Sequence, residues 1–264
     1  MASGGSWEDL LPRLGSAAVM ATIGVLAVWL GGAWFTGLAA LVSGTMVWEL
    51  TRMMVPGASG RLPIQMALVT GATVFVAWLL PPYAAFPLLA IPCVIGAWQL
   101  PRDRGIYLAF AMAMLVTGYG LASFRADHGI VWLVWLILVV IATDVAGYFA
   151  GRFIGGPKFW PRVSPKKTWS GILGGWFAAM LIGLIFLSFT TAGPDLPWIS
   201  MALSFASQMG DAAESALKRR VGVKDSSSLL PGHGGLFDRF DGLLGASLFM
   251  LLVAQLVYVP EVRF

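Results

Sequence analysis

The sequence predicts an all-α, polytopic integral membrane protein with about nine transmembrane helices and a polar site on the cytoplasmic side of its C-terminal half. Of its 264 residues, 58% are hydrophobic and 11% charged, and the mean hydropathy is +0.80. A soluble domain is about 45–50% apolar and about 25% charged. The chain also holds 12 Trp and 32 Gly. Trp gathers at membrane interfaces, and Gly lets membrane helices approach closely.

The individual helices follow from apolar runs of about 20 residues, the length that crosses a bilayer. Gly31-Gly32 predicts a tight hairpin between the first two runs, and Pro81-Pro82 predicts another between the third and fourth. No small-x-small cleavage pattern follows the first run, so we expect a retained helix rather than a signal peptide. The predicted spans are 15–31, 33–50, 63–80, 83–100, 105–123, 130–150, 170–190, 197–216 and 242–259.

Basic residues set the expected orientation. With the N-terminus inside, fifteen of the 17 Lys and Arg residues fall on the cytoplasmic side, and only Arg125 and Arg263 fall outside. This distribution follows the positive-inside rule and places both basic loops in the cytoplasm. We expect one membrane domain over 1–264, with N-terminal helices in about 10–125 and catalytic helices and loops in 126–259.

The N-terminal helices offer little chemistry. Glu49 is expected at a helix end near the interface, where snorkelling or capping is more common than catalysis. Cys93, the single cysteine, lies in an apolar run and is expected to be a small core residue. The chemistry is therefore expected in the second half of the chain.

Three acids, Asp144, Asp211 and Glu214, stand within or at the ends of apolar runs there. A charged side chain at the bilayer centre costs about 2.5–3.5 kcal/mol on insertion scales, so such a group normally faces a cavity, a cation or a metal. Helical spacing puts Asp144, Tyr148 and Arg152 on one stripe, and Asp211, Ser215 and Lys218 on another. The alternative is two structural ion pairs, Asp144 with Arg152 and Asp211 with Lys218.

The motif S-P-K-K-T-W-S-G, Ser164 to Gly171, precedes the seventh apolar run. Two ammonium groups, a hydroxyl and free backbone N–H groups at a helix start are the ingredients of a phosphate site. The chain has no G-x-x-x-x-G-K-[ST] motif, which excludes a P-loop. A K-K-T run beside a membrane can equally be a topology signal.

A third motif, P-G-H-G-G-L-F-D-R-F-D, runs from Pro231 to Asp241. Its glycines allow the backbone to approach a ligand closely. Asp238 and Asp241 share one face at a helix start, and carboxylates without Cys or His partners suit Mg²⁺ rather than zinc. His233 could act as a general base, or it could contact a phosphate.

The run from Ser215 to Asp241, S-A-L-K-R-R-V-G-V-K-D-S-S-S-L-L-P-G-H-G-G-L-F-D-R-F-D, resembles the signature of the CDP-diacylglycerol synthases, or phosphatidate cytidylyltransferases. The stretches 144–152, 164–171 and 207–211 are similar to the same family, and the resemblance covers about 10–260. It implies that a phosphatidate oxygen attacks the α-phosphorus of CTP and expels pyrophosphate. It also implies a homodimer among membrane lipids in a bacterial-type inner membrane, a cytoplasmic active site and no nucleic-acid partner.

The resemblance also implies roles for individual residues. The expected Mg²⁺ ligands are Asp211, Asp238 and Asp241, and the need for a second, monovalent cation is left open. The expected catalytic residues are Asp211, Asp238, Lys218, Arg219, Lys224 and His233. The expected substrate-binding residues are Asp144, Ser164, Lys166, Lys167, Thr168, Ser215, Asp225, Gly234, Gly235 and Arg239.

Two other functions stay open at this point. A polytopic anion transporter could use intramembrane acids and lysines, although its outer helix ends would then carry more charge than they do here. A CTP-dependent polyprenol or lipid kinase would also use CTP and Mg²⁺, but it would release CDP instead of pyrophosphate.

Overall fold

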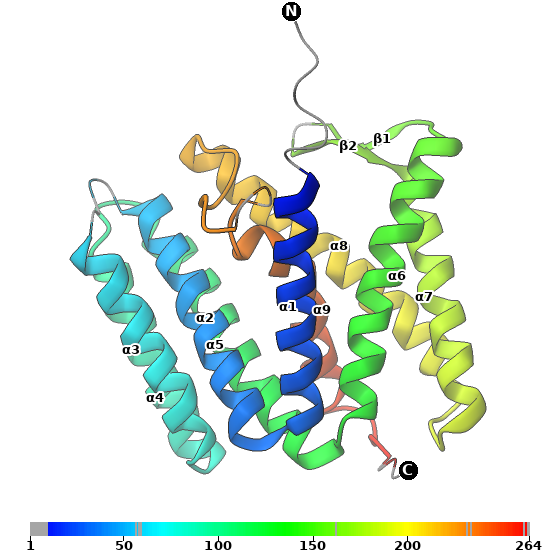
Figure 1. Ribbon diagram of the computed structural model, residues 1–264, viewed down its shortest axis with the longest axis horizontal. Coiled ribbons are helices and arrows are strands. Elements are labelled where there is room, and N and C mark those ends of the chain that lie inside the picture. Colours follow the sequence, from blue (N-terminus) through cyan, green and yellow to red (C-terminus); the bar gives the residue numbers. More distant parts are fainter. Residues whose placement is uncertain are drawn as a thin grey trace, which may run out of the picture. The chain divides into compact units, whose positions relative to one another are not determined.

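The computed structural model describes residues 10–55, 57, 60–161, 163–230, 232, 234–260 and 262. Over this part of the chain the protein has nine helices and one small antiparallel sheet (Figure 1). The helices are α1 (Leu10–Leu30), α2 (Gly32–Met54), α3 (Arg61–Trp78), α4 (Pro82–Trp98), α5 (Arg104–His128), α6 (Val131–Phe153), α7 (Trp169–Phe189), α8 (Leu196–Val221) and α9 (Phe237–Val253). The strands are β1 (Lys158–Trp160) and β2 (Ser164–Thr168).

The predicted helical membrane class is confirmed. Among the described residues, five helices are long and apolar enough to cross a bilayer: α2, α3, α5, α6 and α7. Two apolar helices are shorter, Leu14–Leu30 within α1 and Pro82–Trp98. The count of nine spans stays a prediction. The hairpin of β1 and β2, which joins α6 to α7, lies where a loop was expected.

The chain divides into two compact units. The first comprises Met1–Ser123 with Val221–Arg239, and the second comprises Phe124–Arg220 with Phe240–Phe264. The first change from one unit to the other falls between Ser123 and Phe124, close to the expected boundary near 125. Residues 221–239, which were expected with the catalytic helices, group instead with the N-terminal helices.

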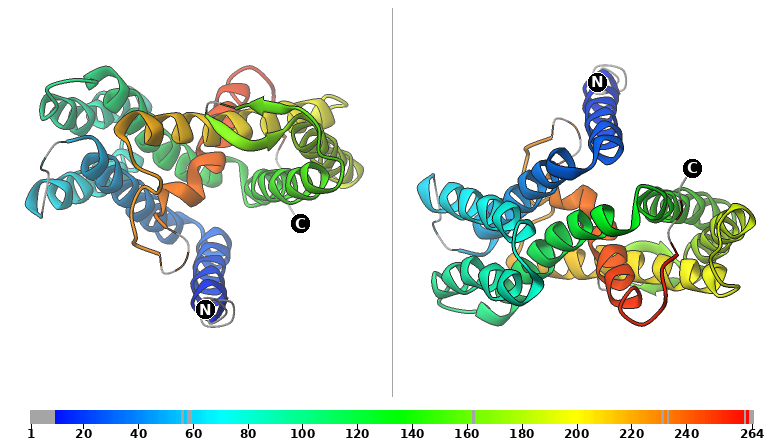
Figure 2. Two further views of the ribbon diagram at one scale, coloured as in Figure 1. Left: turned by 90° about the horizontal axis from the view of Figure 1, so that it is seen from above. Right: turned by 90° about the horizontal axis from the view of Figure 1, so that it is seen from below.

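In the first unit, α2 packs along α3, and α3 along α4 (Figures 1 and 2). Small residues make the close α2–α3 approach possible, because a Cβ on Gly44 would lie 2.6 Å from the carbonyl oxygen of Ala67. Two hydrogen bonds tie α2 to α5. Thr51 Oγ1 lies 2.9 Å from Tyr107 Oη, and Ser43 Oγ donates to Met114 O at 3.2 Å. These bonds satisfy polar groups that the hydrocarbon region cannot solvate.

In the second unit, α6 and α7 run side by side (Figure 2). Hydrogen bonds from α6 and α7 hold α8. Trp135 Nε1 donates to Ser200 Oγ at 3.0 Å, and Thr143 Oγ1 donates to Ser204 Oγ at 2.8 Å. Gln208 extends this row, because its side chain accepts a hydrogen bond from Trp176 Nε1 at 3.0 Å. The row sets the rotation of α8, and therefore the direction in which its acids face.

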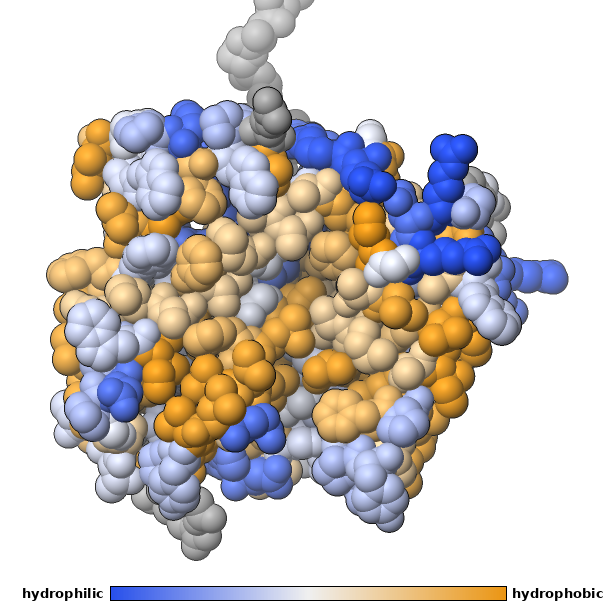
Figure 3. All heavy atoms as spheres, turned by 180° about the vertical axis from the view of Figure 1, so that it is seen from behind, coloured by the Kyte–Doolittle hydropathy of each residue, from blue (hydrophilic) through white to orange (hydrophobic). Residues whose placement is uncertain are grey.

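The space-filling view shows apolar side chains over the middle lengths of the helices and hydrophilic side chains toward their ends (Figure 3). Large apolar side chains such as Trp34, Leu68, Phe153 and Phe177 are exposed. In a soluble protein such a surface would be an aggregation liability, whereas lipid covers it without cost.

The α2–α3 contact gives a stability prediction. We expect Gly44→Ala to lower the free energy of unfolding by about 1–3 kcal/mol, because the new methyl group would force two backbones apart. Gly37→Ala is the matched control on the same helix, since a Cβ there meets nothing within 4 Å. Thermal unfolding of both purified variants in detergent measures the difference. Equal midpoints for the two variants would contradict the tight α2–α3 contact.

Candidate active site

The C-terminal part of the signature run folds around the carboxylate of Asp238. Its Oδ2 accepts hydrogen bonds from Ser226 N and Ser226 Oγ, both at 2.9 Å, and from Gly235 N at 2.8 Å. All three donors belong to the segment before α9, which we call the signature loop (residues 222–236). Asp238 therefore closes the signature loop onto the first turn of α9. Its role as a magnesium ligand stays a prediction.

The two predicted glycine positions are explained by the loop geometry. Gly234 has φ +84°, a left-handed conformation that favours glycine, and its carbonyl accepts from Leu230 N at 2.8 Å. A Cβ on Gly235 would collide with Ser226 Oγ and with the carboxylate of Glu49. His233 and Pro231 lie outside the described residues. The predicted catalytic residue Lys224 and the predicted substrate contacts Asp225 and Arg239 are exposed.

Glu49 is fully buried and contacts the signature loop from α2. It accepts hydrogen bonds from Ser227 Oγ at 2.6 Å, Leu236 N at 2.8 Å and Phe237 N at 2.6 Å. Of the two roles expected at this position, snorkelling is wrong, because the carboxylate finds its donors inside the protein. Glu49 does cap a helix, but it caps the start of α9, where Phe237 is the first residue, and not the end of its own helix.

A second group of charges lies in the other unit, around Asp211 on α8. Lys167, on β2, places its Nζ 2.5 Å from Asp211 Oδ2 and 3.4 Å from Gln208 O. Asp211 Oδ1 accepts a hydrogen bond from Ser215 Oγ at 3.3 Å. The Asp211 side chain is 36% exposed and that of Lys167 24%. The pair is therefore sheltered but reachable by a soluble ligand.

Two further carboxylates lie within electrostatic reach of Asp211. Asp144 on α6 is repelled by Asp211 and attracted by Lys167. Burial, and then the charge of Asp211, raise the pKa of Asp241 to about 7. The backbone N–H of Gly242 donates to Asp241 Oδ1 at 2.8 Å and partly offsets this effect. The cluster around Asp211 thus sets three carboxylates, Asp144, Asp211 and Asp241, against two lysines, Lys167 and Lys218.

Such an excess of carboxylate charge fits a divalent cation. Among the described residues, no three His, Cys, Asp or Glu side chains converge closely enough to hold a metal by themselves. Mg²⁺ does not require such a cage, because it commonly takes one or two carboxylates and completes its shell with water and substrate phosphates. The donor set is compatible with Mg²⁺ bound together with a nucleotide.

The ion pairs expected as the structural alternative are wrong in both cases. Lys218 pairs with Glu214, with Nζ 2.6 Å from Oε2, and Asp211 pairs with Lys167. Glu214 lies one turn before Lys218 on the same helix, whereas Asp211 lies two turns away. Arg152 donates to Tyr148 Oη at 2.6 Å and finds its partner there. Of the two acids predicted for the site, Asp211 is half-buried and Asp144 is exposed on α6.

The β1–β2 hairpin separates the two predicted lysines. Lys167 is half-buried against Asp211, whereas Lys166 is exposed. Thr168 is buried and caps α7, since its Oγ1 accepts from Gly171 N at 3.2 Å. Its hydroxyl therefore has a structural role in addition to any contact with substrate. Ser164 is half-buried and Arg219 is exposed.

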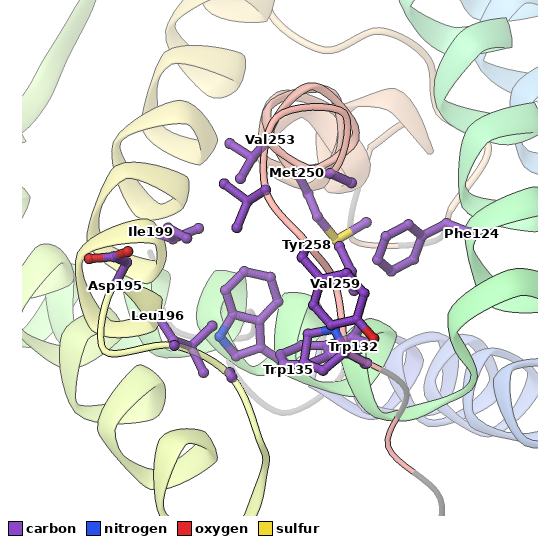
Figure 4. A pocket seen from close by; sticks show the side chains of 15 residues that line it. Phe124, Trp132, Trp135, Asp195, Leu196, Ile199, Met250, Val253, Tyr258 and Val259 are labelled. Carbon is purple, nitrogen blue, oxygen red and sulfur yellow. The ribbon is translucent and has the colours of Figure 1, made fainter.

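A separate apolar pocket lies in the second unit, among Trp132, Trp135, Met250 and Tyr258 (Figure 4). Asp195 is the acid among its lining residues. None of the predicted site residues lines this pocket over the described part of the chain. It therefore contributes nothing to the charged clusters.

The sequence reasoning missed Ser226, Ser227 and Gln208 as site-forming residues. The two serines belong to the signature run, but nothing in their type distinguishes a loop hydrogen bond from exposure. Gln208 was detectable in principle, because an amide within an apolar helix needs a partner.

Comparison with known proteins agrees with the signature. The sequence model of the cytidylyltransferase family matches residues 12–257. A protein of Brucella suis biovar 1 (strain 1330), named phosphatidate cytidylyltransferase, is 36% identical over 273 residues that cover 97% of each chain. A protein of the same name from Staphylococcus aureus (strain COL) is 37% identical over 160 residues, which cover 57% of this chain and 61% of that one.

Proposed function

This chain belongs to the cytidylyltransferase family, and from that membership we infer that it is a phosphatidate cytidylyltransferase. It is a nucleotidyltransferase of phospholipid biosynthesis that uses CTP and phosphatidate. A phosphate oxygen of phosphatidate attacks the α-phosphorus of CTP. The new P–O bond forms as the bond to the β-phosphate breaks, so that CDP-diacylglycerol and pyrophosphate result. The observation that carries this conclusion is the 36% identity, across 97% of the chain, with a protein of that name.

We propose that the lysines and carboxylates around Asp211 supply charge for this reaction. Both substrates are anionic, so their approach requires cations. Lys167 and Lys218 are sheltered enough for their charges to act at reduced dielectric, whereas Arg219 and Lys224 are exposed and suit initial capture. Positioning and charge neutralisation contribute most to phosphoryl-transfer rates. Asp144, whose charge interacts with Asp211 and Lys167, would complete the polar surroundings.

The proposed magnesium ligands are Asp211, Asp238 and Asp241. Asp238 and Asp241 lie three residues apart in the first turns of α9. When bound, Mg²⁺ would neutralise the triphosphate and the leaving pyrophosphate. The carboxylates clustered around Asp211 support the assignment of Asp211 and Asp241, and the family resemblance supports that of Asp238.

The finer topology is also a proposal. We propose nine spans from the apolar runs, and an N-terminus inside with a cytoplasmic active site from the distribution of basic residues. The family resemblance supports a bacterial-type inner membrane. CTP is a cytoplasmic, water-soluble substrate, which agrees with this orientation. The homodimer and contacts with specific membrane lipids are supported by the family resemblance.

The decisive experiment follows the fate of the cytidine. Purified protein in detergent is incubated with phosphatidate, Mg²⁺ and CTP labelled in the cytidine moiety. We expect a labelled lipid and an equal amount of pyrophosphate, both lost on chelation with EDTA. Labelled CDP left in the water phase would identify a lipid kinase instead. No consumption of CTP would contradict an enzymatic function and favour the transporter.

A further inference from the structure

Glu49 is a buried carboxylate far in sequence from every motif that predicts chemistry. We propose that Glu49 is a positioning residue for the signature loop in cytidylyl transfer, through hydrogen bonds that hold the loop and the start of α9. The proposal rests on the proposed function and adds to it a residue from the N-terminal helices. It lies entirely within the first unit, because α2 and residues 221–239 both belong there.

The contacts of Glu49 use both carboxylate oxygens. Oε1 accepts from Ser227 Oγ at 2.6 Å and from Leu236 N at 2.8 Å, and Oε2 accepts from Phe237 N at 2.6 Å. The side chain itself is fully buried. Hydrogen bonds to an ionised acceptor are stronger than those between neutral groups, and more so away from water. One side chain of α2 therefore fixes both ends of the loop segment from Ser227 to Leu236.

The position of these donors explains why a carboxylate is required. The first backbone N–H groups of a helix have no partner within the helix, and the helix dipole favours a negative charge there. Phe237 N is such a group at the start of α9. An N-cap side chain usually supplies the acceptor from the adjacent sequence. Here it comes from another helix, so the cap also fixes the loop to α2.

Asp238 completes the arrangement from the other side. Its Oδ2 accepts hydrogen bonds from Ser226 and Gly235. These residues are the sequence neighbours of Ser227 and Leu236, which donate to Glu49. The loop is thus bound at each end by two carboxylates of different origin. Gly235 lies between them, where any side chain would collide with Glu49. The segment between Ser227 and Leu236 contains the predicted substrate contact Gly234. The predicted site residues Lys224 and Asp225 immediately precede Ser226 in the same loop.

Glu49 has no predicted contact with substrate, so it acts through the loop. We expect Glu49→Gln to lower kcat/KM for CTP by about 10- to 100-fold, because one amide oxygen cannot replace two carboxylate oxygens and the amide N–H groups would face backbone donors. Thr51→Val is the matched control. Thr51 is equally buried and also on α2, but its hydroxyl pairs with Tyr107. We expect this control to change kcat/KM by less than about twofold.

A second measurement reports on the loop without reference to activity. Leu236 is half-buried in the signature loop, and the native Cys93 is buried. A Leu236→Cys background keeps the backbone N–H that Glu49 binds and places a sheltered thiol in the loop, so its reaction with a water-soluble maleimide reports how often the loop opens. We expect the Ser227 and Glu49 contacts to slow labelling, so Glu49→Gln should accelerate it several-fold and Thr51→Val should not. Ser227→Ala, which removes one of the three bonds, should act in the same direction more weakly and serves if Glu49→Gln fails to fold.

The outcomes distinguish the positioning role of Glu49 from the proposed enzymatic function. Faster labelling together with reduced kcat/KM in Glu49→Gln, but not in Thr51→Val, supports the positioning role. Unchanged labelling and unchanged kcat/KM in Glu49→Gln would overturn it. An equal loss of kcat/KM in Glu49→Gln and Thr51→Val without faster labelling would also overturn it, because that result indicates a merely structural role. An inactive wild-type protein would contradict the proposed function, and the labelling comparison would still decide whether Glu49 holds the loop.

Discussion

Asp211→Asn is expected to reduce the rate of CDP-diacylglycerol formation by about 10³-fold or more. The substitution removes the charge that pairs with Lys167 at 2.5 Å. The same charge acts on both Asp144 and Asp241, so Asp211 is the carboxylate that links the group. A neutral amide would also bind a divalent cation far more weakly than a carboxylate does. Because Asn has nearly the same shape, the helix should stay folded and inserted.

The measurement is the release of pyrophosphate by the purified variant, with the thermal unfolding midpoint as a check of folding. Asp195→Asn is a suitable control. Asp195 immediately precedes α8, the helix that carries Asp211, but it is exposed and lines the apolar pocket. We expect its rate to stay within about twofold of wild type. Full activity of Asp211→Asn at saturating Mg²⁺ would exclude Asp211 as a metal ligand.

Lys167→Met should lower kcat/KM by about 10²-fold, and Lys166→Met by less than about tenfold. The two substitutions remove the same charge from adjacent residues. Only Lys167 is half-buried against Asp211, where a positive charge acts at lower dielectric, whereas Lys166 is exposed and screened by salt.

Initial rates of both variants over a range of CTP and NaCl concentrations test this difference. The small effect of Lys166→Met should shrink further at high salt, while the large effect of Lys167→Met should persist. Equal losses in the two variants would show that the lysines act together as a topology signal or a diffuse phosphate surface. In that case the contact with Asp211 would have no special role.

The structure changes the meaning of several residues that the sequence had identified. Spacing along one helix placed Asp211 and Lys218 on a shared stripe, but each found another partner, because a residue one turn away or on a facing element lies closer than one two turns along. Asp238 was expected only as a metal ligand, and the structure adds a role in closing the signature loop. Thr168 similarly caps α7.

The sequence by itself determined the membrane class, the apolar segments and the family, because these depend on composition, on the length of apolar runs and on a long specific motif. It also located Asp144 and Asp211 as ionisable groups that a membrane would not tolerate without partners, and Lys167 as part of a candidate phosphate motif in a basic loop. Only the tertiary structure decided that Lys167 faces Asp211, that Lys166 does not, and that Glu49 holds the signature loop. Those contacts join elements far apart in the chain, and helical or strand periodicity specifies a face of one element but never the neighbour that packs against it.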